Sequence, residues 1–117
     1  MSSKRVRQRL RDMIDNADAV ATYIANGTEA EFGSDRRTLD AVERCLERIC
    51  EASVKVGEKR MAELAPDVPV RRLRSLGNAL RHDYDIVDRR TLWLLISVDL
   101  PKLRSECARA LERLDEP

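Results

Sequence analysis

Aromatic residues, glycine and proline are all scarce in this sequence. Phe, Trp and Tyr together make up 3% of the 117 residues, and Gly and Pro occur four times each. Strand-forming residues are sparse and never alternate with polar ones over a useful stretch, so the composition disfavours a β-sandwich. Charged residues reach 37%, which favours a helical protein. We therefore expect an all-α fold, an antiparallel bundle of four to five helices, and the length predicts a single domain over residues 1–117.

Long apolar runs and metal-binding spacings are also missing. No run of about 18 apolar residues occurs, and the stretch MSSKRVRQRLRDM lacks the apolar core of a signal peptide, so we expect neither membrane insertion nor secretion. Cys45, Cys50 and Cys107 follow no metal-binding or redox spacing. An odd number of cysteines without a secretion signal is typical of reduced thiols. The sequence predicts a cytoplasmic protein, and no metal or cofactor is expected.

Apolar residues recur at steps of three and four, which is the period of a helix with one buried face. In the first such stretch they are Val6, Leu10, Met13, Ala17, Val20 and Ile24. The sequence APDVP at residues 65–69 interrupts the pattern. The period predicts helices over residues 4–25, 35–64, 70–82 and 89–114.

Polar residues, glycine and proline mark the expected ends of these helices. Asn26-Gly27 suits a left-handed cap at the end of the first helix, and Ser34 suits the cap at the start of the second. Gly57 is expected to bend the second helix. Asp88 is the expected cap of the helix that begins at residue 89, and Pro101 is expected to break or kink that helix.

Basic residues gather in one part of the chain, although the formal net charge is only +1. Residues 70–90 contain six arginines against three aspartates. A local excess of positive charge attracts phosphate. The alternative is a charged helix face that is merely solvated.

The predicted helix over residues 70–82 separates apolar from polar side chains. At 100° per residue, Leu73, Leu76 and Leu80 fall within about 60° of one another and are expected to face the core. The opposite side carries, within about 100°, the residues Arg74, Asn78, Arg81 and His82. His82 is the only histidine, and Tyr84 follows two residues later.

These polar side chains suit the cleavage of RNA without a metal ion. An imidazole can take or give a proton near neutral pH, and a guanidinium can hold a phosphate and stabilise added negative charge. From the residue types alone, a histidine that caps a helix end, solvated arginines, and a tyrosine that packs its ring and exposes its hydroxyl to water are the more common interpretation.

The sequence LGNALRHDYDIVDRRTLWLLISVDLPKL, residues 76–103, resembles the HepT-like branch of the HEPN superfamily. The pair His82-x-Tyr84, Trp93 and the run Asp99-Leu100-Pro101 are the most specific parts of this resemblance. RLRDMIDNADAV and DRRTLDAVERCLERICEASVKV are similar to the first two long helices of the family, so that the resemblance covers nearly the whole chain.

The resemblance implies a dimeric, HEPN-like bundle that acts as a toxin ribonuclease on RNA. It implies a homodimer whose two sites meet in a cleft, and a minimal nucleotidyltransferase antitoxin as partner. That partner silences such a toxin, in a type VII-like pair, by transferring AMP to the motif tyrosine, which corresponds to Tyr84. The motif histidine corresponds to His82.

The motif arginine does not carry over directly. With a gap of four residues the family pattern places it at residue 77, which is Gly77 in this chain, and gaps of five or six residues reach Leu76 and Ser75. We therefore assign the catalytic guanidinium groups to Arg74 and Arg81 jointly, and substrate binding to Asn78 and Arg71.

Two alternatives stay open at the level of sequence. The first is a non-catalytic HEPN binding module that serves as substrate or scaffold for the nucleotidyltransferase, which Gly77 favours. The second is a helical dimer with a structural role only. The apolar stripes of the first two helices are compatible with dimerisation under every hypothesis, so they do not discriminate.

Overall fold

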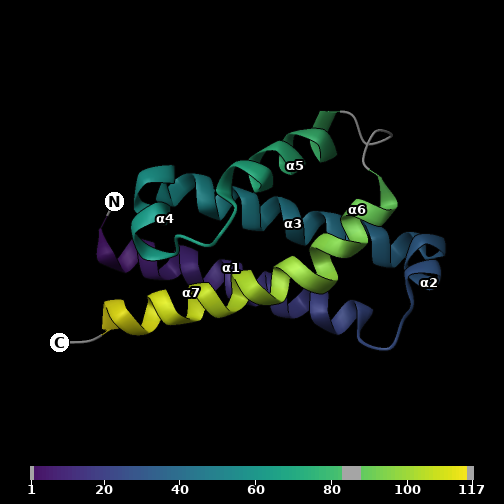
Figure 1. Ribbon diagram of the computed structural model, residues 1–117, viewed down its shortest axis with the longest axis horizontal. Helices are drawn as coiled ribbons and strands as arrows, with labels where there is room; N and C mark the ends of the chain where they lie inside the picture. The colour runs from purple at the N-terminus through teal and green to yellow at the C-terminus, as the bar shows by residue number, and fades with distance from the viewer. Residues whose placement is uncertain (1, 83–87, 116–117) are drawn as a thin grey trace.

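The computed structural model describes residues 2–82 and 88–115, and within these ranges it contains helices and no strand. The prediction of an all-α fold is confirmed. The molecule is elongated, measuring 47 × 29 × 20 Å, and Figure 1 shows its long helices running along the longest axis. In chain order the elements are α1 Ser3–Ile24, α2 Glu29–Ser34, α3 Arg36–Val56, α4 Glu58–Leu64, α5 Val70–His82, α6 Arg89–Leu94, the π-helical segment η2 Leu95–Asp99, and α7 Leu100–Asp115.

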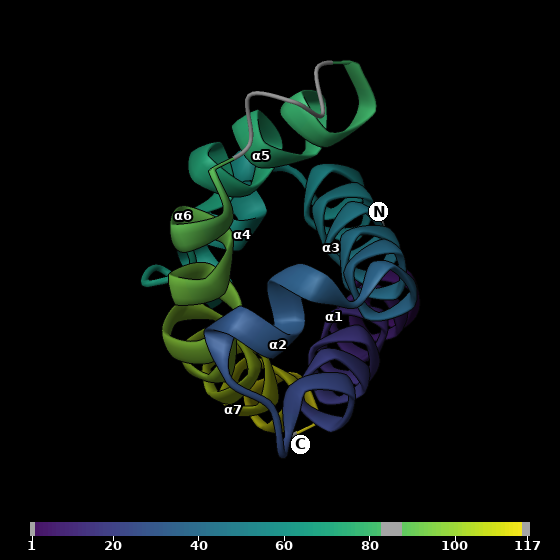
Figure 2. The same ribbon diagram turned by 90° about the vertical axis from the view of Figure 1, so that its right-hand side faces the viewer.

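Three long helices form the core. α1 packs against both α3 and α7, and viewed from the end that carries α2, α1 and α3 lie on one side while α6 and α7 lie on the other (Figure 2). The predicted apolar stripe of α1 is buried at five positions, and its last member, Ile24, is partly buried against the same core. The five buried positions are Val6, Leu10, Met13, Ala17 and Val20.

The prediction of a left-handed cap at the end of α1 was wrong. α1 ends at Ile24, its C-cap Ala25 has right-handed helical angles, and among the described residues only Gly57 has a positive φ. The N–H of Gly27 donates to the carbonyl of Ile24 at 3.1 Å. The chain therefore leaves α1 through an ordinary turn and needs no left-handed residue.

The start of α3 lies one residue later than predicted. Ser34 ends the short helix α2, which the apolar pattern had not indicated, and Asp35 caps α3 by accepting hydrogen bonds from the N–H groups of Arg37 and Thr38. The Thr38 hydroxyl also donates to Asp35 at 2.8 Å. These bonds, that of the hydroxyl foremost, hold the pKa of Asp35 below its ordinary value.

The expected break at Pro101 is absent, and the helix passes through it. The N–H of Leu100 bonds to the carbonyl of Leu95, five residues back, so the chain widens into the π-helical turn η2 before α7 begins. Proline is tolerated in the first turn of a helix, where its missing N–H removes no bond. The wider turn thus places Pro101 where it can continue the helix, and Asp88 caps this long helical stretch as predicted.

Candidate active site

α5 has the bounds that the apolar pattern predicted, Val70 to His82. A hydrogen bond of 3.0 Å from the N–H of Leu73 to the carbonyl of Pro69 closes its first turn. Leu73 is 2% exposed, and Leu76 is partly buried against the core. These two leucines confirm the predicted inner face of α5, which packs against α3 and slopes away from the long axis toward its C-terminus (Figure 1).

The polar face of α5 carries Arg74 and Asn78, and both are exposed. Arg71 is also exposed, but its Nε donates to Glu58 Oε1 of α4 at 2.7 Å. This hydrogen bond and the charge of Arg71, with a further contribution from the charge of Arg74, hold the pKa of Glu58 below its ordinary value. The structure thus places the guanidinium groups of Arg71 and Arg74 on the solvent side of one helix.

His82 is the last residue of α5. The side chains of Leu80, Arg81 and His82 lie outside the described residues, and so does the whole of Tyr84. Gly77 falls in the middle turns of α5. Of the motif, the structure therefore places the backbone of His82, at the C-terminal end of α5.

A groove of about 460 Å³ lies between α5 and the α6–η2 stretch. Its apolar wall consists of Leu76 and Ala79 from α5, and of Leu92 and Leu95 from the other side. Its polar rim consists of Arg71, Arg72, Ser75, Asp88 and Thr91. The sequence did not predict this groove, because its two walls come from helices whose separation depends on the tertiary packing.

Two polar contacts fix the rim of the groove. Arg72 reaches Asp99 with 3.4 Å between guanidinium nitrogen and carboxylate oxygen. Asp88 Oδ2 accepts from the N–H and the hydroxyl of Thr91 at 3.2 and 2.9 Å. The hydrogen bond from the Thr91 hydroxyl is the main reason why the pKa of Asp88 lies below its ordinary value. The carboxylate is therefore anionic at neutral pH and committed to the start of α6.

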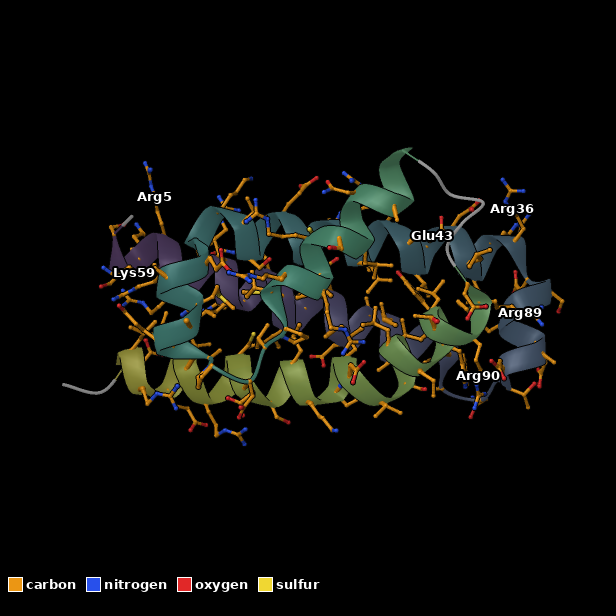
Figure 3. The ribbon with its side chains drawn as sticks, turned by 45° about the horizontal axis from the view of Figure 1, so that its top comes forward. Arg5, Arg36, Glu43, Lys59, Arg89 and Arg90 are labelled. Carbon is orange, nitrogen blue, oxygen red and sulfur yellow. The ribbon has the colours of Figure 1, made fainter. Side chains whose placement is uncertain are left out.

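The start of α6 is held against α2 by its two arginines. Arg90 donates to Glu29 at 2.7 Å, and the side chain of Arg89 lies so close to Gly33 that a Cβ there would clash with it. Figure 3 shows both arginines at the end of the molecule where α2 lies. Phe32 of α2 and Trp93 of α6 add a ring contact with 5.6 Å between centroids. These contacts hold the start of α6 against α2.

Cys45, Cys50 and Cys107 are buried thiols, and burial raises the pKa of the Cys107 thiol to about 12. Within residues 2–82 and 88–115 no group of three or more His, Cys, Asp or Glu side chains is arranged to hold a metal ion. None of the helices in the described ranges has the length and apolar character needed to cross a bilayer.

Comparison with known proteins gives a consistent result. Putative RNase MJ1380 of Methanocaldococcus jannaschii is 32% identical over 106 residues, which are 91% of this chain and 96% of that protein. Probable ribonuclease HepT of Thermococcus cleftensis is 30% identical over 97 residues, or 83% of this chain and 87% of that protein. No solved structure gives a significant match. The family model described as "Ribonuclease HepT-like" matches residues 13–110. The chain belongs to the HepT-like ribonuclease family.

Proposed function

We propose that the protein is a metal-independent endoribonuclease, the toxin of a type VII-like toxin–antitoxin pair, built as a single HEPN/HepT-like domain that works in the cytoplasm. One observation carries this proposal. α5 is an amphipathic helix, anchored by Leu73, that presents exposed arginine and asparagine side chains and ends at the family's His-x-Tyr motif. The names of the relatives, which describe ribonucleases, support RNA as the substrate.

In the proposed reaction His82 moves the protons. A neutral imidazole takes the proton of a ribose 2′-hydroxyl, the 2′-oxygen attacks the adjacent phosphorus, and the 5′-oxygen leaves with a proton from an imidazolium. The products are a 2′,3′-cyclic phosphate and a 5′-hydroxyl. A homodimer that brings two motifs into one cleft supplies both a base and an acid.

Arg74 and Arg81 hold the phosphate in this proposal. Negative charge grows on the phosphate oxygens in the transition state, and guanidinium groups stabilise it through charge-assisted hydrogen bonds. Asn78 orients the substrate. Arg71 binds a neighbouring phosphate. To do so it gives up its exposed ion pair with Glu58, which costs little because exposed ion pairs contribute little to stability.

The proposed inactivation acts on Tyr84. The phenol oxygen attacks the α-phosphorus of ATP bound to a nucleotidyltransferase antitoxin, and pyrophosphate leaves. The attached nucleotide blocks the cleft and places negative charge where the RNA phosphate must lie. Tyr84 stands two residues after His82, which supports its assignment to the same cleft.

RNA cleavage by the pure protein tests the catalytic assignment. We expect fragments that end in a 2′,3′-cyclic phosphate, and we expect His82→Ala to lower the rate at least about 100-fold, which is the usual contribution of a positioned acid or base. The matched control is Arg60→Ala on α4, an exposed arginine outside the proposed site. Equal rates for His82→Ala and the parent protein would show that this histidine does not act in catalysis.

Mass spectrometry tests the inactivation. After co-expression with the nucleotidyltransferase we expect added AMP on the parent protein and none on Tyr84→Phe. Added AMP on the phenylalanine variant would assign the modification to another residue.

Gly77 favours a second candidate function. Because glycine occupies the position of the family's motif arginine, the chain also fits a non-catalytic HEPN module that serves as substrate or scaffold for the nucleotidyltransferase. In that case Tyr84 is modified while the pure protein leaves RNA intact. Gly77→Arg distinguishes the two: on a catalytically weakened frame it should raise cleavage, whereas on a scaffold it changes nothing.

A further inference from the structure

The groove between α5 and the α6–η2 stretch lies next to the motif. Its walls include Ala79 on α5 and Asp88 before α6, which flank the stretch that carries the motif. At a rise of 1.5 Å per residue, Ala79 and His82 are about 4.5 Å apart along the helix axis. A chemical group seated at this end of the groove is therefore within reach of a phosphate held at the end of α5.

The shape and lining of the groove suit a flat, apolar ring. Leu76 and Ala79 face Leu92 and Leu95 across it, and the small side chain of Ala79 leaves room between the two walls. Its volume of about 460 Å³ falls in the range of small-molecule pockets, about 300–1,000 Å³. A base taken out of its stack can bind in such a site, where its faces contact apolar side chains.

The rim of the groove suits the phosphates that flank such a base. The side chains of Arg71 and Arg72 are 87% and 64% exposed, and each is oriented by one carboxylate. Exposed ion pairs of this kind contribute little, so a phosphate can compete for either guanidinium. Ser75 and Thr91 add hydroxyl groups on opposite walls.

The same features disfavour a second copy of the chain as the occupant. The exposed apolar side chains of this region, Leu94 and Val98, do not line the groove. Leu94 and Val98 thus offer a second copy an apolar surface outside the groove. Within the groove the apolar strip is bordered by the guanidinium groups of Arg71 and Arg72, which fit the phosphates on either side of a base.

We propose that this groove binds the nucleobase next to the scissile phosphate, and that Ala79 keeps it open for that base. The proposal rests on the proposed ribonuclease function and adds a position at which the enzyme senses the base itself.

Binding of short RNA tests the groove separately from cleavage. In a His82→Ala background, fluorescence anisotropy gives the Kd of a single-stranded RNA pentanucleotide and of five versions that each carry one abasic position. We expect one abasic position to weaken binding about ten-fold, the usual effect of losing one stacked base. Ala79→Phe, which fills the groove, should weaken the binding of the intact RNA by a similar factor. In this variant the abasic position should no longer change the Kd.

Ala21→Phe is the matched control, because Ala21 is an exposed alanine of α1 that lines no part of the groove. It should leave every Kd unchanged, and melting curves of both variants show whether they are folded. If Ala79→Phe does not fold, Arg72→Gln is tested in its place. This variant should weaken the binding of all six RNAs alike, and it should lower the slope of log Kd against log salt by about 0.7.

Two outcomes overturn the proposal. The first is a folded Ala79→Phe, or an Arg72→Gln in its place, that binds all six RNAs as its background protein does. The second is an Ala79→Phe that loses its dimer by light scattering while the abasic effect persists, which would make the groove a contact between copies. If the protein with intact His82 fails to cleave RNA but the base-dependent binding is found, the ribonuclease proposal fails and the groove stands.

Discussion

Glu43 is the carboxyl group whose surroundings most disfavour its charge among the described residues. It is half-buried on α3 (Figure 3), and Asp40 and Glu47 lie one turn away on either side. Burial, with added repulsion from these two carboxylates, raises the pKa of Glu43 to about 7, against a weaker opposing effect of Arg36. The folded protein therefore keeps a proton that the unfolded chain loses near pH 4.5.

This proton makes stability depend on pH in a direction opposite to that of most carboxylates. Between pH 4.5 and 7 the folded state binds more protons than the unfolded state, so the free energy of unfolding falls as pH rises. The full shift corresponds to about 3 kcal/mol, and solvent screening of a half-exposed group reduces this to about 1 kcal/mol.

We expect Glu43→Gln to remove that dependence. Urea unfolding at pH 5, 6, 7 and 8 should show the parent protein losing about 1 kcal/mol more than the variant over this range. Glu112→Gln, an exposed replacement on α7, is the matched control and should follow the parent. Parallel curves for Glu43→Gln and the parent would show that Glu43 titrates at an ordinary pKa.

Gly57 joins α3 to α4 in a conformation that suits glycine. Its φ is +97°, and a Cβ added there would meet no atom within 4 Å. Gly57→Ala should therefore lower the free energy of unfolding through backbone strain alone, by about 1–3 kcal/mol. Gly27→Ala is the control, because its Cβ would lie 3.8 Å from the nearest atom and its φ is not positive. Equal stability of the two variants in urea would refute the strain.

At the level of helices, the spacing of apolar residues predicted the structure better than the capping residues and Pro101 did. The stripe of α1 and the bounds of α5 follow from apolar spacing, because burial decides both. Ser34 and Asp35 are both good capping residues, so only the geometry selects Asp35. Pro101 is compatible with a continuous helix because the preceding turn is π-helical, and that turn depends on packing that no local rule contains.

The candidate site shows the same division. Leu73 and Leu76 were predicted to face the core and do so, and Arg74 and Asn78 were predicted to face solvent and do so. The pairs Arg71–Glu58 and Arg72–Asp99 join residues 13 and 27 positions apart. Pairs of this kind arise from the crossing of helices, so the sequence could not indicate that Arg71 has a partner or that a groove lies beside it.

For the whole molecule, the distribution of packing separates a core from the helix that carries the motif. α1 lies between α3 and α7, whereas α5 packs chiefly on α3. Among the described side chains of α5, Val70 and Leu73 are buried, and Leu76 and Ala79 are half-buried. Local opening costs less where fewer apolar side chains must be exposed. α5 should therefore open without the rest of the bundle.

Hydrogen exchange under native conditions tests this separation. We expect the amides of α5 to exchange well before those of α1. Leu73→Ala should speed exchange in α5 and leave α1 and α7 nearly as protected as before, because the cavity lies under α5 alone. Leu10→Ala, in the core, should lower global stability by about 2–5 kcal/mol and speed the slowest amides of α1, α3 and α7 together. If the amides of α5 and α1 exchange at one rate in the parent protein, the bundle opens as a single unit. RNA that binds at the end of α5 could then not shift a local opening of this helix.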